Sequence, residues 1–195
     1  VSPDEFIEKY GSDTFRAYLM FMGPFDEGGD WNDQGITGID RFLKKVWRFC
    51  QLPNSEEVSP KKDIQILHQT IHAVKNDLNE MKFNTAISRL MEFINYFSSH
   101  ESTTMDIKLN LIKMIAPLTP HIAEELWEIN GGESSIFLES YPEYDPALAE
   151  EDSVTIAIQI NGKLRGAIEI DKGTDKNEVL KTSKEILSSI LSRIR

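Results

Sequence analysis

Helical periodicity between Ile36 and Asn130 constrains the fold of this 195-residue chain more than any other feature. Apolar side chains recur there at the spacing of three and four residues that places them on one face of a helix. The pattern is cleanest over 83–97, and it also covers 36–50, 64–78, 107–115 and 120–130. Short connections between such helices favour an up-and-down bundle. We therefore predict a mainly α fold with a helical bundle over 35–132.

The segment 1–34 predicts two short helices and a loop ahead of the bundle. Gly11 separates the two helices, and either Ser12 or Asp13 is suited to cap the second. Residues 24–35 are too rich in glycine and aspartate for regular structure.

The last helix of the predicted bundle has a well-marked start. Pro117 ends the helix before it, Thr119 is suited to cap the new helix, and Pro120 suits its first position. His121 follows at this helix start, where we expect a structural role and not that of a general base.

The character of the chain changes after Gly132. Residues 133–153 are acidic and contain two prolines, which predicts an irregular linker or strap. Strict alternation of apolar residues over 154–160 predicts a strand, Asn161-Gly162 predicts a tight hairpin turn, and 163–170 supplies the partner strand.

A final amphipathic helix is expected to begin at Thr174 or Asp175 and to run through Ile194. One hairpin and one helix make a thin core. We therefore expect 154–195 to be the start of a small α/β domain that is truncated after the helix.

The net charge of −11 argues against a protein that coats nucleic acid without sequence preference, because phosphate binding needs clustered cations. The distribution is uneven, since 154–195 holds eight basic and five acidic residues. No apolar run approaches the ~18 residues of a membrane span. The single cysteine, Cys50, precludes an internal disulfide and fits a reducing cytoplasm. We expect a monomer that does not engage membranes.

Two sets of cations stand out as candidates for contact with nucleic acid. Arg41, Lys44, Lys45 and Arg48 recur at helical spacing on one face of the predicted helix 36–50. They are either an ordinary solvated face or, in a chain this acidic, its best RNA-facing stripe.

The second set is Lys163 and Arg165 beside the hairpin turn. A spacing of two in a strand places both on one face, with Leu164 on the other. Such a pair of cations either contacts phosphates or protects an edge strand from aggregation, and the sequence physics favours neither.

Other potential chemistry is weak. His68 and His72 share a helical face, but no third ligand accompanies them, so we predict no metal site. Cys50 ends an apolar face and is expected to be a core residue. The sequence contains no phosphate-binding glycine loop and no nucleophile elbow. We predict neither catalytic residues nor a cofactor in this chain.

Several motifs resemble class I aminoacyl-tRNA synthetases, and in detail bacterial leucyl-tRNA synthetases. Residues 10–16, YGSDTFR, resemble the segment that follows the KMSKS loop, and 20–24, MFMGP, are similar to the leucyl continuation. Residues 114–127, MIAPLTPHIAEELW, and 83–91, FNTAISRLM, resemble bundle helices of this class. Residues 158–166, IQINGKLRG, look like the start of the bacterial leucyl C-terminal domain.

This resemblance implies a C-terminal piece of a larger enzyme, beginning just after the KMSKS loop. It implies an anticodon-binding-type bundle followed by a small α/β domain that touches the tRNA. The full enzyme would use ATP with magnesium to join leucine to tRNA(Leu), and a separate domain would hydrolyse mischarged tRNA. Because the catalytic and editing motifs are absent from the sequence, the piece itself should bind tRNA and should not catalyse.

Two alternatives stay open at this stage. The chain could be the corresponding region of a valyl or isoleucyl enzyme, although those would end in a coiled coil or a cysteine-bound zinc element. It could also be a helical protein-interaction module without an RNA role, which the acidic bulk charge favours and the cation sets disfavour.

Overall fold

The computed structural model describes residues 2–150, 153–160, 163–171, 173–175 and 179–181. It separates into two compact units, residues 1–149 and 150–195, which are treated one at a time below. Among the described residues, no helix is both long enough and apolar enough to span a bilayer.

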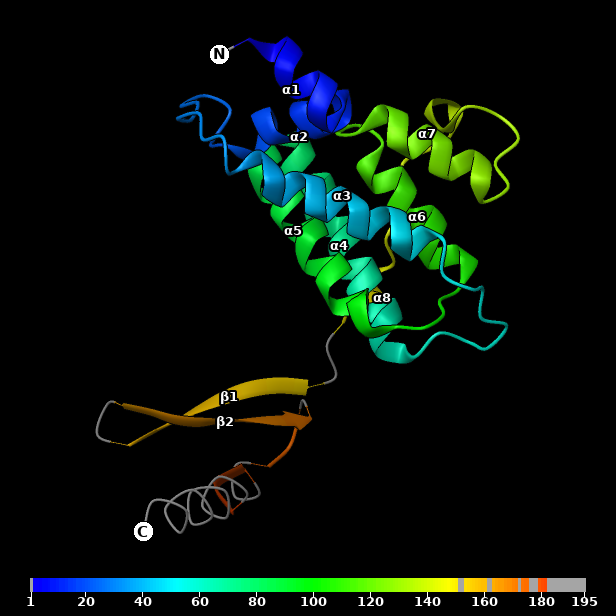
Figure 1. Ribbon diagram of the computed structural model, residues 1–195. Coiled ribbons are helices and arrows are strands. Elements are labelled where there is room, and N and C mark those ends of the chain that lie inside the picture. The colour runs from blue at the N-terminus through cyan, green and yellow to red at the C-terminus, as the bar shows by residue number, and fades with distance from the viewer. Residues whose placement is uncertain (1, 151–152, 161–162, 172, 176–178, 182–195) are drawn as a thin grey trace. The chain divides into compact units, whose positions relative to one another are not determined.

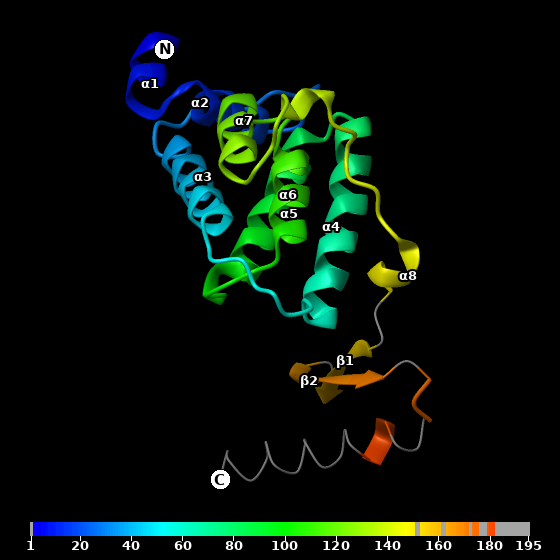
Figure 2. The ribbon, with the colours of Figure 1, turned by 90° about the vertical axis from the view of Figure 1, so that its right-hand side faces the viewer.

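The first unit is the helical bundle that the sequence predicts. Figures 1 and 2 show α3, α4, α5 and α6 packed side by side, with α2 and α7 across one end. The main helices are α1 (Pro3–Tyr10), α2 (Ser12–Phe21), α3 (Ile36–Cys50), α4 (Lys61–Asn79), α5 (Phe83–Tyr96), α6 (Met105–Ile115) and α7 (Pro120–Ile129). Three short elements complete the unit: the 3₁₀ turns η1 (Phe97–Ser99) and η2 (Ile136–Leu138), and α8 (Pro146–Ala149).

The core forms where the apolar faces of these helices meet. Phe49 of α3 lies 6.4 Å from Phe93 and 5.3 Å from Phe97, measured between ring centroids, and both partners are buried. Leu111 of α6 and Ile39 of α3 are fully buried in the same cluster. The amphipathic patterns read from the sequence therefore mark the faces that lose contact with water.

The loop between α2 and α3 is irregular, as predicted, and tightly held. Trp31 packs against Phe6, Phe15 and Tyr18, and the Tyr18 hydroxyl donates to the carbonyl of Asn32 at 2.7 Å. These contacts fix the distance between the end of α2 and the start of α3.

Residues 139–149, called the strap below, lie against α4. The ring of Tyr144 stacks on His72 with 4.2 Å between centroids, and the backbone N–H of Asp145 donates to Nδ1 of His68 at 3.1 Å. The Gln69 side chain donates to the carbonyl of Ala149 at 2.9 Å. The strap therefore belongs to the first compact unit, which extends to residue 149.

In the second unit, β1 (Ser153–Ile160) and β2 (Lys163–Asp171) form an antiparallel pair, as predicted. Ile158 and Ile168 are its buried residues among those described. The register shifts at Ile158/Gln159, because Ile158 pairs with Gly166 while Gln159 pairs with Leu164. The turn Asn161-Gly162 and most of the predicted final helix lie outside the described residues; residues 179–181 are helical.

Candidate nucleic-acid interface

Helix α3 presents the cations singled out in the sequence. Its apolar face is buried, and Arg41, Lys44, Lys45 and Arg48 are all exposed. We call these four residues the α3 cations. Their exposure is the expected consequence of amphipathic spacing, because a lysine or arginine on the buried face would lose its hydration. The structure brings the four together on one element, as the sequence predicts.

The α3 cations do not form one uniform stripe. Lys44 makes an i,i+4 ion pair with Asp40 at 2.7 Å, although its side chain is still 69% exposed. Lys45 extends the other way, across to α5, where its Nζ donates to Oδ1 of Asn95 at 2.8 Å. Lys44 therefore has an anionic partner, whereas Lys45 is bonded to a neutral amide.

The two arginines are held by their own helix. Nε of Arg41 donates to the carbonyl of Thr37, and Nε of Arg48 donates to the carbonyl of Lys44, both at 3.3 Å. Both bonds use Nε, and within the described chain no bond engages the terminal amino groups of either arginine. A guanidinium positioned in this way can present its remaining N–H groups to a phosphate.

Two adjoining hollows run between α3 and α5, and we call them together the cationic groove. One, of about 330 Å³, has Lys45, Arg48, Ser98 and His100 among its lining residues, over the buried rings of Phe49 and Phe97. The other, of about 250 Å³, is lined by Gly38, Arg41, Phe42, Lys45, Met91 and Asn95. Lys45 lines both hollows, and with Arg41 and Arg48 it makes three of the four α3 cations that border this pair of hollows.

The groove residues on α5 and η1 were not identified from the sequence. Asn95, Ser98 and His100 become part of the site only because α5 packs beside α3. The carboxylate of Asp63 lies 3.3 Å from Nε2 of His100 and holds this side chain in place. The same carboxylate accepts from the Tyr96 hydroxyl at 2.9 Å, and burial together with this bond raises the pKa of Tyr96 to about 12.

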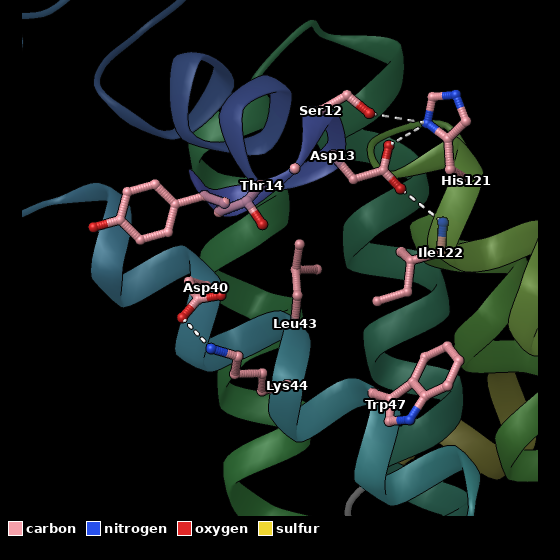
Figure 3. A pocket seen from close by; sticks show the side chains of 11 residues that line it. Ser12, Asp13, Thr14, Asp40, Leu43, Lys44, Trp47, His121 and Ile122 are labelled. Carbon is pink, nitrogen blue, oxygen red and sulfur yellow. Dashed lines mark hydrogen bonds and ion pairs between the residues drawn. The ribbon is translucent and has the colours of Figure 1, made fainter. Parts of the chain in front are cut away.

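On the other side of α3 lies a hollow of about 380 Å³, which we call the α2–α3–α7 pocket (Figure 3). It is lined by Tyr10, Gly11, Ser12, Asp13, Thr14, Asp40, Leu43, Lys44, Trp47, His121 and Ile122. Asp13 crosses it to bind α7: one carboxylate oxygen lies 2.8 Å from His121 Nδ1 and the other accepts from the Ile122 N–H at 2.7 Å.

The side-chain caps predicted for α2 and α7 are both wrong. Neither Ser12 nor Asp13 caps α2, which begins after Gly11 without a side-chain cap. Thr119 does not cap α7 either, because its hydroxyl donates back to the carbonyl of Ile115 at 3.3 Å. Asp13 supplies an acceptor for α7 instead, from more than 100 residues earlier in the chain. Through its contact with Asp13, His121 takes part in the link between α2 and α7.

The second predicted cation set lies in the other unit. Lys163 and Arg165 belong to β2, but their side chains are outside what the structure describes. The register shift leaves Arg165 as the extra residue of a β-bulge. That both side chains share a face stays a prediction. Gly166 beside the bulge is the sequence signal that could have indicated this irregularity.

No metal centre or catalytic group emerges from the described residues. Among them, no cluster of three His, Cys, Asp or Glu side chains could hold a metal ion. His68 and His72 hold the strap, as described above. The described residues thus offer cationic and aromatic surface for binding.

Cys50 is buried, as expected of a core residue. Burial raises the pKa of its thiol to about 12, although nearby Lys108 acts in the opposite direction. Since the thiolate is the reactive form, Cys50 should not react with a disulfide reagent such as DTNB at pH 8 in the folded protein. Labelling should become rapid and stoichiometric in denaturant. Rapid labelling without denaturant would contradict this burial.

Comparison with known sequences matches the chain to one family model and to leucine–tRNA ligases. A family model described as the anticodon-binding domain of tRNA ligase matches residues 64–180, from within α4 to beyond β2. The leucine–tRNA ligase of Borrelia hermsii (strain HS1 / DAH) is 43% identical over 183 residues, which cover 93% of this chain and 22% of that protein. The leucine–tRNA ligase of Chlorobium chlorochromatii (strain CaD3) is 38% identical over 195 residues, covering 96% and 24% respectively.

A solved structure is also similar. The crystal structure of the ternary complex of Agrobacterium radiobacter K84 agnB2 LeuRS–tRNA–LeuAMS matches with a TM-score of 0.72 and 25% identity. The match covers 93% of this chain and 26% of that one. The chain therefore spans about a quarter of the length of the relatives that it matches.

Proposed function

The chain belongs to the anticodon-binding domain family of tRNA ligases, and from this premise we propose that it is the tRNA-docking portion of a leucine–tRNA ligase. The parent protein would join leucine to tRNA(Leu) at the expense of ATP. Similarity to leucine–tRNA ligases over nearly the whole chain supports leucine over valine or isoleucine. The likeness to a synthetase in complex with tRNA supports docking of the bundle on tRNA.

The observation that carries the proposal is the cationic groove between α3 and α5. Three exposed cations border it, in a protein with a net charge of −11. Over the rest of residues 1–153 carboxylates predominate and repel phosphate, so the RNA backbone should approach the bundle along α3. Such contacts fix the position and orientation of the RNA and carry no sequence information themselves. The groove would therefore position the body of the tRNA, and other parts of the parent protein would select leucine.

Each cation has a definable role in this docking. Arg41 and Arg48 would present their terminal N–H groups to phosphate oxygens. Lys45 is steered toward the groove by its bond to Asn95, so less side-chain entropy is lost when a phosphate arrives. Lys44 should contribute less, because its ammonium group already forms an ion pair with Asp40.

Leucine, ATP and magnesium would act in the part of the parent outside this chain. The sequence offers no phosphate-binding loop, and the described residues offer no metal cluster. We also propose that the hairpin unit adds to tRNA binding through Lys163 and Arg165, and that the parent acts in the cytoplasm.

The isolated chain should bind tRNA(Leu) and should not activate leucine. We expect its affinity to fall steeply with salt, because each phosphate contact releases counterions and contributes about −0.9 to the slope of log K against log salt. Binding would be measured by fluorescence anisotropy across a salt series, and activation by leucine-dependent ATP–pyrophosphate exchange. Absence of salt-dependent binding would favour a protein-interaction module, and exchange by the purified chain would refute its predicted inactivity.

A further inference from the structure

We propose that the α2–α3–α7 pocket binds one unstacked nucleobase of the docked tRNA, with Trp47 as its stacking surface. This inference rests on the function proposed above and extends it from backbone contacts to a base contact. It concerns the side of α3 opposite the cationic groove.

The first argument is the chemistry of the pocket walls. Trp47 and Tyr10 are half-buried aromatic side chains, and Leu43 and Ile122 supply aliphatic surface between the helices that form the pocket. Figure 3 shows Leu43 and Ile122 pointing toward the middle of the hollow and Trp47 at one end. A volume of about 380 Å³ lies in the range of roughly 300–1,000 Å³ typical of ligand sites. Flat apolar surface of this kind suits the face of an aromatic ring.

The second argument is the charge of the pocket. Lys44 is paired with Asp40 at its rim, and Asp13 is occupied by His121 and Ile122. A pocket that holds two carboxylates and one lysine, all already bonded to partners, does not attract a phosphate strongly, in contrast to the cationic groove. It can instead accept a neutral ring whose polar edge needs both donors and acceptors. A carboxylate such as Asp40 accepts from exocyclic amino groups of bases, and hydroxyls such as Ser12 serve either role.

The third argument is the spacing along α3. Lys44 and Trp47 are three residues apart and therefore neighbours on one helix face. Trp47 could hold a base while the adjacent ammonium of Lys44 meets the phosphate of the same or the next nucleotide. Unpaired nucleotides in RNA are commonly bound in this manner, by an aromatic platform beside a cation.

The fourth argument is that the pocket is already assembled. The two bonds of Asp13 tie the start of α2 to the start of α7, and both helix starts form the pocket wall. Gly11 lies in the pocket wall and has a φ of +85°. The space beside its Cα is open, because a Cβ built there would meet no atom within 4 Å. A base would therefore enter a formed hollow without the cost of ordering its walls.

The test is Trp47→Leu in the complete chain, which removes the ring and keeps apolar volume. Loss of one base stack should weaken tRNA(Leu) binding roughly five- to one-hundred-fold. The slope of log affinity against log salt should stay at the wild-type value, because stacking releases no counterions. Trp47→Phe keeps a flat ring and should retain most of the affinity. Thermal melting would verify that both variants fold.

A second arm works from the RNA and does not depend on a folded variant. A set of tRNA(Leu) molecules would each lack one base at an unpaired position. One such removal should weaken binding to the wild-type chain as much as Trp47→Leu does, and should weaken the variant no further, because both changes delete the same contact.

The outcomes separate the two proposals. If Trp47→Leu folds and binds with unchanged affinity while wild-type binding depends steeply on salt, the base pocket is refuted and tRNA docking stands. The same holds if every base removal acts additively with Trp47→Leu. If the wild-type chain does not bind tRNA at all, the proposed function fails and the base pocket fails with it.

Discussion

Reversing the charge of Lys45 and Arg48 together is expected to weaken tRNA(Leu) binding on the order of a hundredfold or more. Both side chains border the larger hollow of the cationic groove. Each charge-assisted bond to a phosphate is worth about 1.5–3 kcal/mol, and about 1.4 kcal/mol corresponds to a factor of ten. Loss of two contacts should also lower the magnitude of the log–log salt slope by about 2. The measurement is the affinity of the Lys45→Glu, Arg48→Glu variant across a salt series.

A matched control exists on α4. Lys62 and Lys75 are exposed and lie outside the groove lining, and their double reversal to glutamate changes the net charge by the same amount. If phosphates contact the groove, the control should bind nearly as tightly as the wild type. Equal losses in both variants would mean that only overall charge matters, and would remove the groove as the docking site. Lys44→Glu should lie between the two, because Lys44 already has Asp40 as a partner.

The helices of this fold could be predicted because their signals are local. Apolar spacing alone gave a helix over 36–50, and α3 spans Ile36–Cys50. The predicted helix over 83–97 corresponds to α5, which passes into a 3₁₀ turn at Phe97. Amphipathic periodicity can be recognised within about ten to fifteen consecutive residues, so a helix can be predicted without knowing which helices pack beside it.

Features that depend on two distant segments could not be predicted in this way. The four α3 cations were identified together, yet Lys44 lines the α2–α3–α7 pocket whereas the other three line the hollows against α5. The strap looked like a linker because its acids and prolines oppose regular structure. The contacts that attach it to α4 come from His68, His72 and Gln69, which carry no signal that pairs them with residues 144–149.

The capping of α7 is the clearest example of a feature that depends on a distant segment of the chain. Thr119 precedes Pro120 and is one of the residue types preferred as a helix N-cap. In the folded protein the acceptor is Asp13, whose side chain is only 11% exposed and whose two oxygens bind His121 and the Ile122 N–H. A carboxylate is also favoured at a helix N-terminus by the helix dipole. We infer that Asp13 stabilises the fold more than Thr119 does.

Asp13→Ala should therefore destabilise the bundle by about 1–3 kcal/mol. The change removes the cap of α7 and leaves the Ile122 N–H without its acceptor at a partly buried site, which costs about 1–3 kcal/mol. For a chain of this size the melting temperature should fall on the order of 5–10 °C. Far-ultraviolet circular dichroism is the suitable measurement, because its signal comes chiefly from the helical unit.

Two variants make this expectation specific. Asp13→Asn keeps one carbonyl oxygen as an acceptor, so it should recover about half of the lost stability. Thr119→Ala removes only the 3.3 Å bond to Ile115 and should cost no more than about 1 kcal/mol. If Thr119→Ala proved the more damaging of the two alanine variants, the local cap would be the important one. The bond between the starts of α2 and α7 would then be a consequence of their packing and not its cause.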